Sequence, residues 1–147
     1  MKEKRKEKKK MQKTEGKTYL LDTSAIIALW SDEKGAGEVE AVLRSREKIY
    51  MSFMSYMECK YRIWKNAGRG TAEEFIKYLE LLPIIRIDLT DKILHLASEI
   101  KATNRLSVAD SWIIASAIEC NAILVNKDPE FAQVKEKVKL YNLPYKK

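Results

Sequence analysis

The chain has 147 residues, a formal net charge of +7, 46% hydrophobic residues and 33% charged residues. This length favours one domain with a substantial core, and the composition excludes disordered and fibrous proteins. No apolar stretch approaches the roughly 20 residues that a membrane span needs. The charged N-terminus has no apolar segment behind it, which excludes a secretory signal. We therefore expect a cytoplasmic protein with no membrane partner.

The positive charge is concentrated at the N-terminus. Residues 1–13 hold eight Lys or Arg and two Glu, a net charge of +6, which leaves about +1 for the rest of the chain. We interpret residues 1–17 as a basic, flexible extension and residues 18–147 as a single domain. Such a run is either a solvated tail or an arm that attracts phosphate backbones without sequence preference.

Short apolar segments bounded by turn residues predict strands, and apolar residues at helical spacing predict helices. The first half is predicted as a strand over 18–21, helices over 25–30 and 38–46, a strand over 48–51, and helices over 52–66 and 71–82. The second half is predicted as a strand over 84–87, helices over 90–102 and 107–120, a strand over 122–125, a short helix, and a closing segment over 138–141.

Hydroxyl side chains precede several of these helices. Thr23 or Ser24 is expected to cap the first helix, and Thr71 with Glu74 has the spacing of a capping box. Strands that alternate with helices predict an α/β fold, a three-layer α/β/α sandwich around a central parallel sheet of four to five strands. No glycine-rich phosphate loop is present, so a P-loop nucleotide site is not supported.

Four acidic residues fall where a parallel sheet would place a ligand, beyond the carboxyl ends of its strands. Asp22 follows the first strand and Asp128 the fourth, while Glu58 and Asp110 lie near the starts of helices. Each has an ordinary alternative, because an acid stabilises a helix start, Asp-Pro forms turns, and Glu58 can be a surface residue. Together the carboxylates would repel one another unless a cation lay between them.

Carboxylate oxygens without histidine or cysteine suit Mg²⁺ or Mn²⁺. The one histidine, His95, is interpreted as a surface or boundary residue, and the two cysteines, Cys59 and Cys120, as buried thiols, so zinc is excluded. Four acids indicate one or two ions with a bound phosphate. This is the arrangement for metal-assisted hydrolysis of a phosphodiester.

Four segments carry a resemblance to a known family: LLDTSAIIAL (20–29), SFMSYMECKYR (52–62), SVADSWIIASAIECNA (107–122) and ILVNKDPEF (123–131). They resemble PIN-domain ribonucleases, with the length and layout of VapC-type toxins. The resemblance implies cleavage of single-stranded RNA, a homodimer, and often an antitoxin that covers the site.

By this resemblance an acidic quartet binds Mg²⁺ or Mn²⁺ and is catalytic: Asp22, Glu58, Asp110 and Asp128. Ser24 corresponds to a hydroxyl position that orients the first acid or touches phosphate. Asn126 departs from the Thr or Ser often found there, but it can still donate a hydrogen bond and is kept as a supporting residue. Glu130 is either an additional acid near the site or a solvated helix residue.

Other functions remain open at this point. One is an RNA-processing PIN nuclease without an antitoxin, and another is a non-catalytic module that holds RNA with the basic extension. An aspartyl-nucleophile phosphatase also places an Asp after its first strand. That chemistry uses a second Asp two residues later, where this chain has Ser24, so it ranks low.

Overall fold

The structure is a computed structural model that describes residues 16–145. It confirms the α/β/α sandwich, with a five-stranded parallel sheet in the order β3-β2-β1-β4-β5. The strands are β1 (Thr18–Leu21), β2 (Lys48–Ser52), β3 (Ile85–Ile87), β4 (Ile123–Asn126) and β5 (Leu140–Asn142). The expected basic extension lies outside the described residues, apart from its last two.

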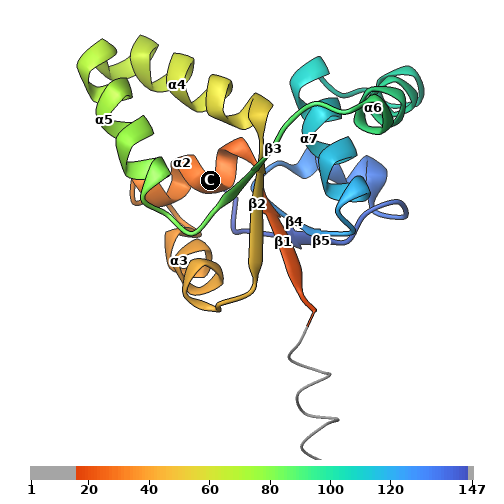
Figure 1. Ribbon diagram of the computed structural model, residues 1–147, viewed down its shortest axis with the longest axis horizontal. Helices are drawn as coiled ribbons and strands as arrows, with labels where there is room; N and C mark the ends of the chain where they lie inside the picture. Colours follow the sequence, from red (N-terminus) through yellow and green to blue (C-terminus); the bar gives the residue numbers. More distant parts are fainter. Residues whose placement is uncertain (1–15, 146–147) are drawn as a thin grey trace, which may run out of the picture.

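Helices cover both faces of the sheet (Figure 1). One face, drawn in orange to green, carries α2 (Thr23–Trp30), α3 (Ala36–Arg44), α4 (Phe53–Ala67) and α5 (Arg69–Glu80). The other face, drawn in teal to blue, carries α6 (Asp91–Thr103), α7 (Val108–Glu119) and the 3₁₀ helix η1 (Pro129–Val134). No helix within the described range is long and apolar enough to cross a membrane.

The neighbouring strands β1 and β4, in the middle of the sheet, are buried on both faces, which explains their apolar sequences. Leu20 pairs in register with Leu124, and Leu21 pairs with Val125. Successive side chains of a strand point to opposite faces. Leu20 and Leu124 accordingly join the core under α6 and α7, whereas Leu21 and Val125 join the core under α2 to α5.

The start of α5 differs from the prediction. The helix begins at Arg69, and its N-cap is Gly68, which has no side chain to bond the first turn. Gly68 also ends α4 and has a φ of 91°, a backbone conformation that favours glycine. Because this glycine reverses the chain, Thr71 already lies inside the first turn, and the predicted capping box with Glu74 does not form.

The residues set aside as non-catalytic lie largely as expected. Cys59 is buried and its pKa is raised by burial, so the thiol is protonated and inert. Cys120 is only partly buried, and both cysteines are free. His95 is exposed on α6, which confirms its interpretation as a surface residue.

The N-cap of α7 offers a test of local stability. The Ser107 hydroxyl accepts a hydrogen bond from the backbone N–H of Asp110 at 3.0 Å. Ser107→Ala removes this acceptor and should cost about 1 kcal/mol, which lowers the melting temperature by about 3 °C. Ser107→Asn supplies another capping oxygen and should melt close to the parent. Equal melting temperatures for the parent and the alanine variant would show that the cap contributes nothing.

Candidate active site

The four predicted acids lie together at one edge of the sheet, the edge where the carboxyl ends of the strands meet (the carboxyl edge). Asp22 directly follows β1, and Asp128 follows β4 by two residues. The helices α4 and α7 bring Glu58 and Asp110 to the same place. The carboxylate of Asp22 is close enough to interact electrostatically with those of Asp110 and Asp128, and Asp110 interacts with Glu58. The parallel topology therefore brings all four charges into one group.

Asp22 is the N-cap of α2, in place of the predicted Thr23 or Ser24. Its Oδ1 accepts a hydrogen bond from the backbone N–H of Ala25 at 2.7 Å. Its own N–H donates to the carbonyl of Val125 at 3.0 Å, so the residue also ends the β1–β4 ladder. These two bonds fix both the backbone and the side chain of Asp22, which is 3% exposed.

Ser24 connects this acid to the loop after β4. Its hydroxyl lies 2.8 Å from both carboxylate oxygens of Asp22, and it accepts a hydrogen bond from the backbone N–H of Lys127 at 3.0 Å. The Lys127 ammonium lies 3.3 Å from a carboxylate oxygen of Glu33, with the lysine side chain only 6% exposed. Ser24 thus joins two segments that are 103 positions apart in the chain.

The hydrogen bonds of Asn126 place the next acid. Its amide nitrogen donates to Oδ1 of Asn142 at 3.0 Å, and its Oδ1 accepts from the backbone N–H of Asp128 at 3.1 Å. Asp128 in turn caps η1 by accepting from the N–H of Glu130 at 2.9 Å. The fully buried Asn126 therefore holds the turn that carries Asp128.

Thr23 holds Glu58, a contact that the sequence did not reveal. Its hydroxyl donates to Oε1 of Glu58 at 2.7 Å and lies 3.1 Å from the hydroxyl of Ser55. The two partners of the shorter bond are 35 positions apart, so no local pattern points to it. The sequence predicts Thr23 only as a possible helix cap, and in the structure Ser52 caps α4.

Burial makes the charge of two of these acids costly. It is the main reason that the pKa of Asp22 rises from 3.8 to about 7; the carboxylates of Asp110 and Asp128 add to the rise, while bonds from Ser24 and Ala25 oppose it. Burial is also the main reason that the pKa of Asp110 rises to about 6. The hydrogen bond with the Ser107 hydroxyl lowers this pKa, and the neighbouring carboxylates raise it further. A cation in this group would favour the ionised form of both acids.

Glu130 joins the acidic group. Carboxylate oxygens of Asp110, Asp128 and Glu130 all lie within 4.8 Å of one another, which favours its interpretation as an additional acid near the site. Within residues 16–145, no Lys or Arg forms an ion pair with any of the five acids. Crowded oxygen donors that form no ion pair with a Lys or Arg of the described residues fit the ligand preference of Mg²⁺ or Mn²⁺.

Comparisons with known proteins identify similar proteins at the level of the family and of the fold. The profile of the PIN domain family matches residues 19–137. A search of curated proteins finds no significant match. The matched range contains all five acids.

Solved structures share the fold at low sequence identity. The structure of VapBC2 from Rickettsia felis bound to a DNA fragment from their promoter contains a similar chain, with 19% identity, a TM-score of 0.72, and coverage of 86% of this chain and 99% of that chain. DNA-bound VapBC from Salmonella typhimurium contains a chain with 16% identity and a TM-score of 0.70, and the match covers 86% of this chain and 98% of that chain. VapBC-1 from nontypeable Haemophilus influenzae contains one with 20% identity and a TM-score of 0.68, with coverage of 85% of this chain and 97% of that chain.

Proposed function

The chain belongs to the PIN domain family, and on that basis we propose that it is a divalent-metal-dependent endoribonuclease that hydrolyses phosphodiester bonds of RNA. The observation that carries this proposal is the group of five carboxylates at the carboxyl edge, with which no Lys or Arg of residues 16–145 forms an ion pair. Such a group favours a metal ion and a bound phosphate over any organic cofactor. We also propose that the domain over residues 18–147 acts in the cytoplasm.

We assign the acids as metal ligands and their partners as positioning residues. Asp22, Glu58, Asp110 and Asp128 would hold Mg²⁺ or Mn²⁺, with Glu130 at the rim. When bound, the metal supplies hydroxide from water and stabilises the charge that develops on the phosphate. Around it, Ser24 orients Asp22, Thr23 holds Glu58, and Asn126 places Asp128 through the backbone.

Metal removal tests the proposal directly. A 5′-labelled single-stranded RNA incubated with the purified protein should stay intact in EDTA and be cut once Mn²⁺ or Mg²⁺ is added in excess, because the proposed hydrolysis needs the chemistry that a bound metal would supply. The products are resolved on a denaturing gel. Asp22→Asn protein, purified in parallel, controls for a contaminating nuclease. Cleavage in EDTA, or equal cleavage by the variant, would contradict the assignment.

We further propose a small antitoxin protein and a second copy of this chain as partners. The similar solved structures include complexes named as toxin–antitoxin pairs. Leu94 and Val108, which are 41% and 59% exposed, line one hollow between α6 and α7, and a partner would cover these apolar side chains. A nuclease of this kind that lacked an antitoxin would use the same chemistry.

A further inference from the structure

Helix α4 begins at the carboxyl edge and extends outward from the sheet (Figure 1). Its first residue, Phe53, directly follows β2, and Glu58 of the acidic group lies in its second turn. Residues three or four positions apart are neighbours on one face of a helix. Arg62 and Lys65 come four and seven positions after Glu58, so they continue the line that Glu58 begins. At about 1.5 Å per residue, this basic line runs about 10 Å away from the acids.

A row of large apolar side chains lies beside the basic line. Met57, Tyr61 and Trp64 have the same helical spacing one position earlier, and they are 53%, 44% and 43% exposed. The helix buries a different face, which includes Cys59 and Ile63. Two aromatic rings therefore stand in solvent next to cationic side chains, although burial of their apolar surface would be favourable.

The charge of this part of the chain has a single sign. Residues 59–70 contain four basic residues and no acidic one. Three of the four, Lys60, Arg62 and Lys65, are exposed and form no ion pair with any of residues 16–145. The positive charge of the helix is therefore available to an anionic ligand.

The fourth basic residue, Arg69, orients one of the rings. Its guanidinium carbon lies 5.2 Å from the centroid of the Trp64 ring, within the range of a cation–π contact. Its ion pair with Glu73, at 3.1 Å, is exposed and contributes little. The contact with Arg69 restricts the rotamers of an exposed indole, so part of the ordering that a ligand would impose is already present.

Aromatic rings between cations favour a single-stranded nucleic acid over a protein as the ligand. Protein interfaces are enriched in aromatic residues but depleted of lysine. Proteins that hold single strands use both, because bases stack on the rings and phosphates lie against the cations. The continuity of the basic line with Glu58 adds that the strand held here is the one that reaches the acids.

We propose that Tyr61, Arg62, Trp64 and Lys65 (the α4 track) bind the single-stranded RNA substrate, with bases stacked on the two rings and the phosphate backbone along the basic line. The identity of the ligand rests on the proposed function. Stacking is tolerant of sequence because every base has an aromatic face, so the track fixes the path of the strand and not its sequence.

Binding without metal separates the α4 track from cleavage. The probes are two fluorescein-labelled 20-nucleotide strands of equal charge, an oligouridine and an abasic ribose–phosphate strand. Each is titrated with the full chain in EDTA and followed by anisotropy. Y61A/W64A should bind the oligouridine about tenfold more weakly, because it lacks the stacking rings, and should bind the abasic strand as the parent does. Y61F/W64F keeps two rings and should bind both strands as the parent does.

The basic half of the track should respond differently. R62A/K65A should weaken the binding of both strands. It should also lower the slope of log K against log salt by about 1.4, since each phosphate contact on a single strand contributes about 0.7. R62K/K65R keeps both charges and should keep the slope of the parent.

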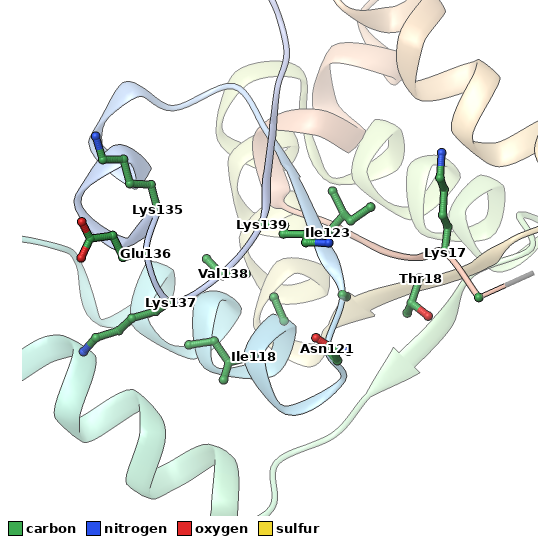
Figure 2. Close-up of a pocket in the computed structure, with 13 residues that line it drawn as sticks. Lys17, Thr18, Ile118, Asn121, Ile123, Lys135, Glu136, Lys137, Val138 and Lys139 are labelled. Atoms are coloured by element: carbon green, nitrogen blue, oxygen red, sulfur yellow. The ribbon is translucent and has the colours of Figure 1, made fainter. Parts of the chain in front are cut away.

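The matched controls remove the same groups elsewhere. K135A/K139A removes two exposed charges at the opposite end of the sheet, where both lysines line a hollow with the first residues of β1 and β4, Thr18 and Ile123 (Figure 2). Tyr145→Ala removes an aromatic ring that is 41% exposed, close to the exposure of Tyr61. Both controls should bind both strands within about twofold of the parent.

Equal losses in the track variants and in their controls would overturn the proposal. It would also be overturned if Y61A/W64A bound RNA as the parent does but changed its oligomeric state in size-exclusion chromatography, because the face would then be a protein interface. Cleavage in Mn²⁺ is scored separately. A parent that shows the expected binding losses but cuts no RNA contradicts the nuclease and supports the track, whereas a parent that cuts RNA while all variants bind equally contradicts the track alone.

Discussion

Asp22→Asn should abolish RNA cleavage and at the same time stabilise the metal-free protein. Asparagine keeps the oxygen that caps Ala25, so the start of α2 survives, while the negative charge disappears. Loss of a partner behind a metal ligand costs roughly 10- to 100-fold in affinity or activity, and loss of the ligand itself should cost at least about 100-fold.

The same substitution should lower activity but raise stability, because the buried negative charge of Asp22 destabilises the metal-free folded protein. Its pKa is 3.8 in the unfolded chain and about 7 in the folded one. The carboxyl therefore ionises less readily in the folded protein than in the unfolded chain, and above pH 7 this difference lowers the free energy of unfolding. The penalty is absent below pH 3.8, grows up to about pH 7, and is constant above it. It amounts to something on the order of 4 kcal/mol at pH 8.

Urea unfolding in EDTA at pH 8 measures the stability, and the RNA assay with Mn²⁺ measures the activity. Asp91→Asn is the control, because Asp91 is an exposed acid in the first turn of α6, away from the carboxyl edge, and its loss should change cleavage little. An Asp22→Asn protein that is less stable than the parent at pH 8 would show that the carboxylate supports the fold, contrary to this account.

Mn²⁺ should raise the melting temperature more at pH 8 than at pH 5.5. A metal binds the ionised carboxylates, whereas at pH 5.5 Asp22 and Asp110, with pKa values of about 7 and about 6, are largely protonated. The ion must then displace their protons, which weakens its binding. At pH 8 and about 100 times the dissociation constant, the metal adds roughly 2.7 kcal/mol, or about 5–10 °C, and at pH 5.5 less than half of that.

Differential scanning fluorimetry with and without Mn²⁺ at the two pH values measures both shifts. In Asp110→Asn the shift at pH 8 should shrink towards zero, because a ligand is lost. NaCl added to the same ionic strength controls for the effect of salt. A Mn²⁺ shift that is equal at the two pH values, or larger at pH 5.5, would mean that these two acids do not take part in binding.

The fold could be predicted because its determinants are local. The apolar run of residues 18–21 and that of 122–125 each fill a strand that is buried on both faces, and Thr90 and Ser107 cap the helices that they precede. The site could be predicted in outline for a related reason. Carboxyl ends of parallel strands meet at one edge, so acids placed just after strands or at helix starts converge there.

The details of the site depend on contacts between distant segments. Asp22, Thr23 and Ser24 are all good capping residues, and which one caps α2 is decided by partners elsewhere. The Thr23 hydroxyl donates a hydrogen bond to Glu58, and the Ser24 hydroxyl accepts one from the backbone N–H of Lys127. Asp22 is therefore the residue that caps α2. Glu130 belongs to the acidic group because the 3₁₀ geometry of η1 turns it there, and a short turn of this kind has no clear sequence signal.

The position of β1 in the sheet sets the order in which the protein can become active during its synthesis. β1 pairs on one side with β2, which is made soon after it, and on the other with β4, which is made long after it. A growing chain can therefore build β1, β2 and β3 with α2 to α5 while Asp110 and Asp128 do not yet exist. Any product that terminates before residue 110 lacks both of them too. A proposed nuclease surrounded by the messenger RNA that encodes it thus carries no complete set of acids until β4 and the turn after it have been made.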